Sequence, residues 1–254
     1  MIKYIEGEIY MSSGSKGFTL VELSIVMIII GLLIGGILKG QQLIENSKIN
    51  STVSQVTAYK TAVNVFRDSF SNLPGDIFSA PSLVPNCNAN TYCQGGDGNL
   101  RIGAANTGGI GSNPNGTENT QFWKHLALAD LISGLAPSAN PATPDWGTTF
   151  PANKFSGGFQ VIFFNVPGAY YDGQYLKMRQ NVTGSDAAVL GTHPINPRIA
   201  SIIDARMDDA NPASGSVISH DVGPGSASGC EPPLPYDTAN ESGNCIMLFK
   251  LDIK

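Results

Sequence analysis

The sequence predicts an α+β protein in which a long N-terminal helix packs on a C-terminal globular domain with an antiparallel sheet. The first observation is an apolar run at 18–38 that is long enough to cross a bilayer. The second is a following segment in which apolar residues recur at helical spacing. The third is a polar remainder with short helix and strand patterns between Gly-, Asn-, Ser- and Pro-rich loops. The predicted organisation is a leader peptide at 1–17, a transmembrane helix at 18–38, its continuation at 39–73 and a globular domain at 74–254.

Composition limits the partners of the chain. Its 254 residues suit one globular core with an appendage, and its formal net charge is -5. Binding to nucleic acid requires clustered Lys and Arg side chains that neutralise phosphates. The acidic balance therefore argues against nucleic acid as a partner.

Residues 1–17 have mixed charge and no hydrophobic period, which is typical of a leader, and Met11 offers a second start. The next segment, from Phe18 to Leu38, has about 21 residues, and about 20 helical residues cross the hydrocarbon of a membrane. Glu22 is its single charged residue. An ordinary secretory signal has a shorter apolar region followed by an A-x-A site. This run is longer and lacks that site, so a membrane helix is predicted.

The helix is predicted to continue beyond the membrane. Pro74 marks its end, because proline lacks the N–H group and disfavours helical geometry in the preceding residue. The apolar residues that recur at three- and four-residue steps are Leu43, Ile49, Val53, Val56, Tyr59, Val63, Phe66 and Phe70.

The remaining chain predicts one α+β domain with an antiparallel sheet. Residues 76–117 and the Pro-rich residues 137–151 are expected to be loops. Periodic segments predict helices at 118–132, ended by Gly134, and at 197–207, and strands at 159–166, 175–182 and 245–253.

Four cysteines form two pairs that are local in the sequence. Cys87 and Cys93 bound a short loop, and Cys230 and Cys245 bound a longer one beside the C-terminus. An even count within loops rich in Gly, Pro and Asn favours two disulfides formed in an oxidising compartment over buried free thiols. The connectivity stays open. Neither pair has the C-x-x-C spacing of a zinc site.

The segment Gly17-Phe18-Thr19-Leu20-Val21-Glu22 resembles the processing and assembly signature of type IV pilins and type II secretion pseudopilins. The resemblance implies cleavage by a prepilin peptidase between Gly17 and Phe18, N-methylation of the Phe18 amine, and assembly through Glu22. It also implies a bacterial inner-membrane subunit with a cytoplasmic N-terminus and a periplasmic domain. The implied partners are the lipid bilayer, other pilin or pseudopilin subunits, the peptidase and an inner-membrane assembly platform.

The chemistry of Glu22 supports this interpretation independently. An acid inside a membrane helix costs on the order of 2.5 to 3.5 kcal/mol and usually has a partner. No basic residue lies near Glu22 in the helix. The amine of Phe18 on a neighbouring subunit would pair with it, but only after residues 1–17 are removed. The alternatives are that Glu22 reaches the membrane interface or is protonated.

Glycines are a second candidate for helix packing. Gly31 and Gly35, and Gly36 and Gly40, form two small-xxx-small pairs that let membrane helices approach closely. Glycine is also common in membrane helices without this role. Many pilins have a proline here that loosens the helix, and the glycines take its place in this chain.

Calcium is the one cofactor that the sequence suggests, because some major pseudopilins bind it in a periplasmic loop. The candidate ligands are Asp97 and Asn99, and Asp208 and Asp209. Neither tract has an EF-hand pattern, so turn or helix-cap roles are favoured and no metal site is predicted.

The sequence predicts no enzyme. It lacks a G-x-S-x-G elbow, a Walker loop and a dinucleotide fingerprint. Its three histidines, His125, His193 and His220, have no H-E-x-x-H spacing and are expected to be structural.

Three further segments look like parts of large pseudopilin-like proteins, namely 73–76, 121–126 and 203–212. Core packing is expected for Phe122 and Trp123 in the second segment. The presence of Glu22 disfavours the family's tip subunit and the long domain disfavours its major subunit, so a minor subunit is favoured. The alternatives are a tethered periplasmic binding protein or hydrolase, and a competence pilin that takes up DNA.

Overall fold

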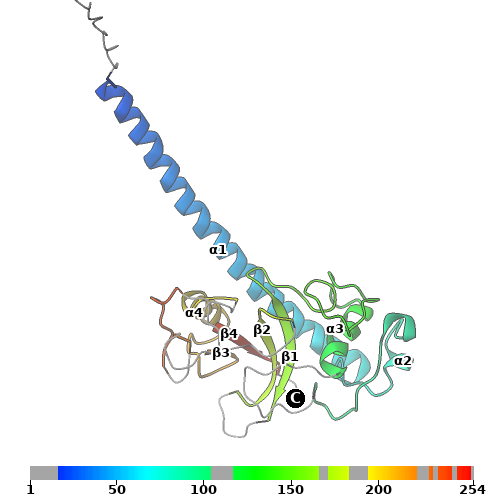
Figure 1. Ribbon diagram of the computed structural model, residues 1–254. Helices are drawn as coiled ribbons and strands as arrows, with labels where there is room; N and C mark the ends of the chain where they lie inside the picture. The colour runs from blue at the N-terminus through cyan, green and yellow to red at the C-terminus, as the bar shows by residue number, and fades with distance from the viewer. Residues whose placement is uncertain are drawn as a thin grey trace, which may run out of the picture. The chain divides into compact units, whose positions relative to one another are not determined.

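The computed structural model describes residues 17–103, 117–165, 171–182, 194–221, 229–230, 234–241 and 245–252. The chain forms two compact units, residues 1–46 and residues 47–254. Helix α1 (Leu20–Phe70) contributes residues to both units (Figure 1). Its residues 20–46 are called the exposed segment below, and its residues 47–70 the packed segment.

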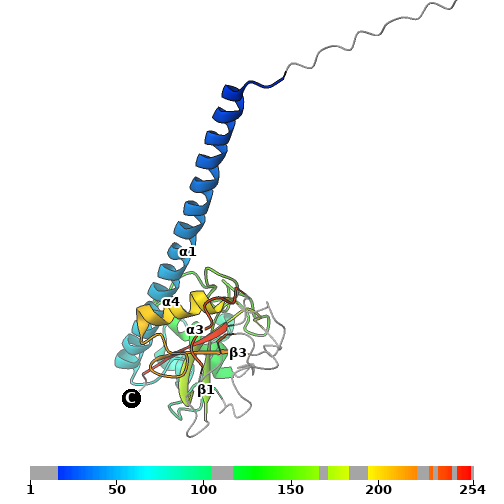
Figure 2. The ribbon, with the colours of Figure 1, turned by 90° about the vertical axis from the view of Figure 1, so that its left-hand side faces the viewer.

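Residues 47–254 form an α+β unit, as predicted. Figure 2 shows α4 and the strands of this unit from a second side. The elements after α1 are α2 (Ala80–Leu83), the 3-10 turn η1 (Ala89–Thr91), α3 (Thr117–Leu128), β1 (Gly158–Phe164), β2 (Gly173–Arg179), α4 (Pro197–Met207), β3 (Val217–Asp221) and β4 (Cys245–Lys250).

The four strands form one antiparallel sheet in the order β1-β2-β4-β3. The register pairs Phe159 with Met178, and Phe249 with both Leu176 and Val217. This confirms the predicted antiparallel sheet. The sequence analysis missed β3, because two apolar residues followed by Ser219 give too short a pattern to indicate a strand.

The core lies between the packed segment of α1, helix α3 and one face of the sheet. Tyr59 connects these layers, since its ring packs edge-on against Trp123 at 4.9 Å and against Phe159 at 5.7 Å. Aromatic pairs in this geometry add to the stabilisation from burial. Phe122 and Trp123 are fully buried, as predicted. The buried apolar face of α1 is Ile49, Val56, Tyr59, Ala62, Val63 and Phe66.

Two helices end earlier than predicted. Helix α1 stops at Phe70, before the proline, because Ser71 is left-handed at φ 53° and its N–H bonds to the carbonyl of Arg67. Helix α3 stops at Leu128 and not at Ile132. Asp130 is left-handed at φ 58°, and the Leu131 N–H bonds back to the Leu126 carbonyl. That is a Schellman ending with Asp130 in the position usually taken by glycine.

Smaller differences concern loops and strand ends. The predicted loop at 76–117 contains α2 and η1 in its described part. Strand β1 ends at Phe164, β2 runs from Gly173 to Arg179, and β4 ends at Lys250, so each is displaced or shortened relative to its prediction. Helix α4 has the predicted bounds, because Asn196 caps the Ile199 N–H and Pro197 begins the helix.

Candidate assembly helix and the disulfide-bound loop

The start of α1 is fixed by a reciprocal cap between Thr19 and Glu22. The Glu22 carboxylate accepts hydrogen bonds from the Thr19 backbone N–H at 2.9 Å and from its hydroxyl at 2.8 Å. The Glu22 N–H donates to the Thr19 hydroxyl oxygen at 3.2 Å. This is a capping box, which satisfies N–H groups that the first helical turn leaves without partners. The T-x-x-E pattern of Thr19 and Glu22 is a signal by which this capping box could have been predicted from the sequence.

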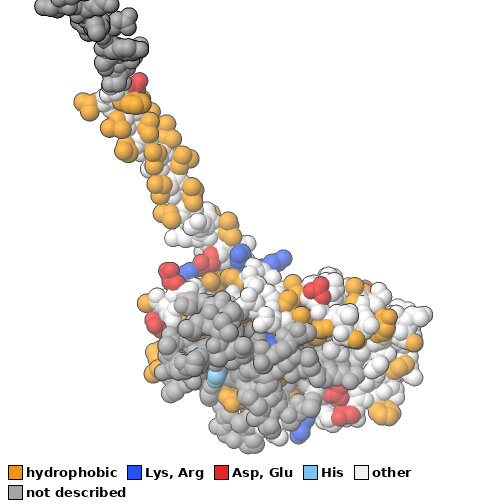
Figure 3. Space-filling view, viewed as in Figure 1, with side chains coloured by type: hydrophobic (Ala, Val, Ile, Leu, Met, Phe, Trp, Pro, Cys, Tyr) orange, Lys and Arg blue, Asp and Glu red, His pale blue; other side chains and the backbone are white. Residues whose placement is uncertain are grey.

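Between Leu23 and Leu38, the exposed segment of α1 carries no charge and is apolar around its whole circumference. Every large apolar residue between Leu20 and Ile44 is exposed, and the side chain of Leu33, for example, is 60% exposed. Figure 3 shows these hydrophobic side chains along the first half of the helix. The helix is long and apolar enough to cross a membrane. A helix that is apolar on every side has no stable surface toward water, so this segment requires another apolar environment.

The four candidate glycines lie in the exposed segment. A Cβ atom added to Gly31, Gly35, Gly36 or Gly40 would meet no atom of this chain within 4 Å. The fold of the single chain therefore does not require small residues at these positions. Their proposed role in packing against other helices stays a prediction.

Residues 12–38 match the family model of the prokaryotic N-terminal methylation motif. This motif is the signature of type IV pilins and pseudopilins. The matched range includes Gly17, Phe18 and Glu22. No curated protein and no solved structure matches the chain. The pilin-type motif therefore identifies the N-terminal region, and the globular unit must be interpreted from its own geometry.

The globular unit contains two disulfides. Cys87 bonds to Cys93 and Cys230 bonds to Cys245, with Cα–Cα distances of 5.0 and 5.7 Å. This confirms that the sequence-local pairs form disulfides. Each closes a loop, and such closure stabilises a protein mainly by restricting its unfolded state.

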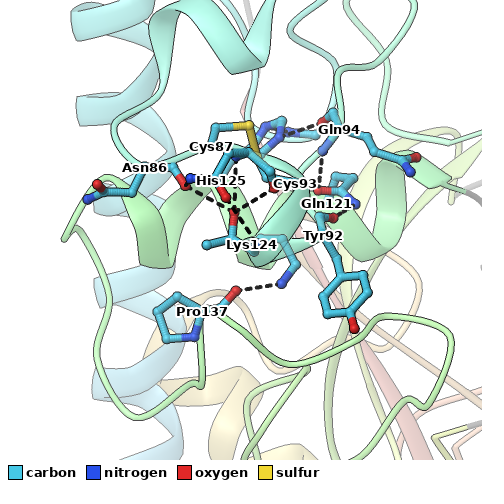
Figure 4. Close-up of a disulfide and its surroundings, with 12 residues drawn as sticks. Asn86, Cys87, Tyr92, Cys93, Gln94, Gln121, Lys124, His125 and Pro137 are labelled. Carbon is cyan, nitrogen blue, oxygen red and sulfur yellow. Dashed lines mark hydrogen bonds between the residues drawn. A yellow bond between two sulfur atoms is a disulfide. The ribbon is translucent and has the colours of Figure 1, made fainter.

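Helix α3 holds the disulfide loop through polar side chains. Gln121 donates from Nε2 to the Tyr92 carbonyl at 2.9 Å and accepts from the Gln94 N–H at 3.1 Å (Figure 4). Lys124 donates from Nζ to the carbonyls of Pro137 and Ala139, so it anchors the Pro-rich loop. Burial lowers the pKa of Lys124. The segment 121–126, singled out in the sequence, thus connects three parts of the unit.

His125 lies at the centre of these contacts and is fully buried. Its Nδ1 accepts from the Gly75 N–H at 2.9 Å, and its Nε2 donates to the Gln94 carbonyl at 2.8 Å. The ring is therefore neutral, with its proton on Nε2. Burial lowers its pKa to about 4. The predicted structural role is what these contacts provide. His193 lies outside the described residues, and His220 lies on β3.

The turn at 73–76 is held by the same network. Gly75 is left-handed at φ 88°, and a Cβ atom there would lie 2.5 Å from the Glu118 carbonyl oxygen. Only glycine fits this approach to α3. The Asp76 carboxylate accepts from the N–H groups of Gly98, Asn99 and Leu100, and so closes the loop over the turn. Burial nevertheless raises the pKa of Asp76 to about 6.

The aspartates suggested as calcium ligands accept hydrogen bonds from this chain. Asp97 accepts from the N–H and the side-chain amide of Asn99. Asp209 accepts from the Asn211 N–H, and Asp208 accepts from the N–H groups of Ser216 and Val217. The contacts of Asp97 and Asp209 are turns, as the sequence favoured, and Asp208 connects the end of α4 to the start of β3.

The structure adds acidic partners that the sequence did not suggest. Oxygen atoms of Asp76, Asp97 and Glu118 lie within 4.8 Å of one another, and so do those of Asp204, Asp208 and Asp209. Asp204 is buried and accepts from the Tyr236 hydroxyl at 2.8 Å. All six carboxylates accept hydrogen bonds from this chain.

Proposed function

We propose that this chain is a structural subunit of a type II secretion pseudopilus or a type IV pilus. A prepilin peptidase removes residues 1–17, the Phe18 amine is methylated, and the mature helices pack together in a filament. The chain resides as a single-pass protein in the bacterial inner membrane, with the N-terminus in the cytoplasm and residues 74–254 in the periplasm. A minor subunit is the variant that the sequence favours. Binding, and not catalysis, is its role.

One observation carries the proposal. The exposed segment is apolar on all sides, but it begins with an acid within the pilin-type motif. A simple membrane anchor needs the apolar length, and Gln could complete its helix cap without the cost that an acid adds in lipid. A subunit that polymerises needs both. The apolar surface packs in lipid and then against other helices, and the acid fixes the stagger between neighbours.

The cap with Thr19 gives the Glu22 carboxylate hydrogen-bond partners before assembly. In the single chain its carboxylate accepts both hydrogen bonds from Thr19, so the charge has partners before assembly. In the filament the Phe18 amine of a neighbouring subunit adds a positive charge to this site. Attraction between opposite charges is stronger in a surrounding of low dielectric constant than in water. Assembly therefore depends on cleavage, which creates that amine.

The first test blocks the cleavage. Gly17→Val should leave the leader attached, and mass spectrometry of the purified protein should find no chain that begins at Phe18. Filaments sheared from cells should be absent. Gly14→Val is the matched control, because it changes a leader glycine away from the junction and should be processed normally. A wild-type protein that retains its leader and is monomeric in membranes would overturn the proposal and favour the tethered binding protein or hydrolase.

The second test separates assembly from processing. Glu22→Gln keeps the size of the side chain and removes its charge. We expect normal cleavage and membrane insertion but loss of the protein from the sheared filament fraction. Glu45→Gln, in the same helix beyond the predicted span, should assemble as the wild type does. Normal assembly of Glu22→Gln would contradict the role of the acid.

A further inference from the structure

Three side chains of metal-binding type converge inside the globular unit. The sulfur atoms of Cys87 and Cys93 and a ring nitrogen of His125 lie within 4.8 Å of one another. All three residues are buried. Figure 4 shows the imidazole of α3 directly beside the disulfide. The sequence could not indicate this group, because the cysteines lack C-x-x-C spacing and the histidine comes from a distant helix.

We propose that the reduced form of the chain binds a thiophilic divalent cation such as Zn²⁺ through Cys87, Cys93 and His125. A dithiol reductant supplies two electrons and two protons to the disulfide, forms its own disulfide and leaves two cysteine thiols. Binding of the cation releases those two protons, because thiolates are the ligands. The disulfide and the metal are thus alternative ways of closing the same loop.

The state of His125 suits a metal ligand. Its ring is neutral, because Nδ1 accepts the Gly75 N–H while Nε2 faces the Gln94 carbonyl. Nε2 donates to the Gln94 carbonyl, which leaves the lone pair on Nδ1. Metal-binding histidines usually donate their other ring N–H to a carbonyl or carboxylate in this way, which fixes the ring. The cation replaces the Gly75 N–H as the partner of Nδ1, so binding costs that hydrogen bond.

The charges of the complex suit a buried site. Two thiolates, a neutral imidazole and a divalent cation sum to zero, and burial penalises any uncompensated charge. Lys124 is the cationic neighbour of His125 on α3, and its ammonium group is directed to the carbonyls of Pro137 and Ala139. A neutral complex is repelled by it far less than an isolated cation.

The two sulfur atoms can reach a metal-binding separation by local movement. Tetrahedral Zn²⁺ with Zn–S bonds of about 2.3 Å separates its sulfur atoms by about 3.8 Å. The Cα atoms of Cys87 and Cys93 are 5.0 Å apart, so rotation of the two side chains can reach that separation. Three protein ligands leave a fourth position for water. The site should therefore bind more weakly than a structural site with four protein ligands.

Cobalt titration tests the proposal on the full chain in detergent. The fully reduced wild type should bind one equivalent of Co²⁺ with the thiolate-to-cobalt charge-transfer band and the intense visible absorption of tetrahedral coordination, and Zn²⁺ should displace it. The oxidised protein should not bind. Cys87→Ser/Cys93→Ser should lose the band while the other cysteine pair is present and reduced. Equal binding by this variant, or no binding by the reduced wild type, would overturn the proposal.

A second measurement identifies the nitrogen ligand without any substitution. X-ray absorption of the Zn²⁺ form should find two sulfur atoms at about 2.3 Å and an imidazole nitrogen at about 2.0 to 2.1 Å. Four sulfur atoms and no imidazole would place the metal between both cysteine pairs and overturn the assignment. His125→Asn retains an acceptor for Gly75 and should weaken Co²⁺ binding by about tenfold or more, since even second-shell changes cost 10- to 100-fold.

Discussion

The two halves of α1 differ in what covers them, although one helix contains both. In the exposed segment, the large apolar residues from Leu20 to Ile44 are left uncovered by the rest of the chain. In the packed segment, apolar residues lie on one face, and that face is buried against α3 and the sheet. Helical structure is common to both halves, so the difference lies in where each half finds its apolar partners.

The comparison separates two kinds of information in one sequence. The periodic pattern of the packed segment specifies a contact within the chain, because only one face is apolar. The exposed segment has apolar residues on all its faces, which indicates that it lies in an apolar medium. Among the features that interrupt this apolar pattern are Glu22, which forms the cap with Thr19, and the glycines. We propose that these features direct the contacts between subunits.

The largest expected effect tests this division directly. Phe66→Ala removes a fully buried ring from the packed segment and should lower the free energy of unfolding by about 3 to 5 kcal/mol. Leu33→Ala in the exposed segment should change it by less than about 0.5 kcal/mol. Urea unfolding of both variants in detergent, followed by tryptophan fluorescence, measures the difference. A large loss in Leu33→Ala would mean that the exposed segment supports the globular unit.

The disulfides sharpen the comparison at the next level. Replacing Cys230 and Cys245 by Ala should cost about 3 kcal/mol, and replacing Cys87 and Cys93 should cost about 2 kcal/mol, because the shorter loop restricts the unfolded chain less. Both losses should appear in the urea unfolding of the globular unit. Amide hydrogen exchange in residues 20–46 should be the same in both variants and the wild type. Faster exchange there would show that the two halves of α1 unfold together.

A third effect concerns pH and depends on His125. Its folded pKa of about 4 lies below its ordinary value of 6.5, so it stabilises the fold above pH 6.5, and this stability is lost as the pH falls toward 4. The loss reaches at most about 1.4 kcal/mol per pH unit. Asp76 and Asp204 act in the opposite direction, since their raised pKa of about 6 costs stability as the pH rises from about 4 to about 6.

Subtracting two pH profiles isolates the histidine. His125→Asn contains the same Asp76 and Asp204, so the difference between its unfolding free energies and those of the wild type reports His125. We expect the wild-type advantage to shrink between pH 6.5 and pH 4. A constant difference across this range would show that the histidine does not titrate with unfolding.

Regular patterns in the sequence predicted the main elements. The helical period of the packed segment, the bounds of α4 and the antiparallel sheet all follow from local patterns. The helix ends were less predictable. Helix α1 ends at Phe70 and α3 at Leu128, shortly before the left-handed residues Ser71 and Asp130. The predicted end signals, Pro74 and Gly134, lie further along the chain.

The network around α3 could not be predicted, because it depends on contacts between distant parts of the chain. Nothing near His125 in the sequence indicates the Gly75 N–H or the disulfide. The Asp76 carboxylate closes a loop more than twenty residues away. A buried polar group shows its role only when its partners are known. The pilin-type motif was recognisable for the opposite reason, since its signal is continuous in the sequence.

The first helical residue, Leu20, has one further consequence. Gly17, Phe18 and Thr19 precede the helix, so the peptide bond assigned to the prepilin peptidase belongs to non-helical backbone. An enzyme can take such a bond into its active site without melting any helical turn. In the proposed processing, cleavage after Gly17 would therefore leave the helix and its Thr19–Glu22 cap intact.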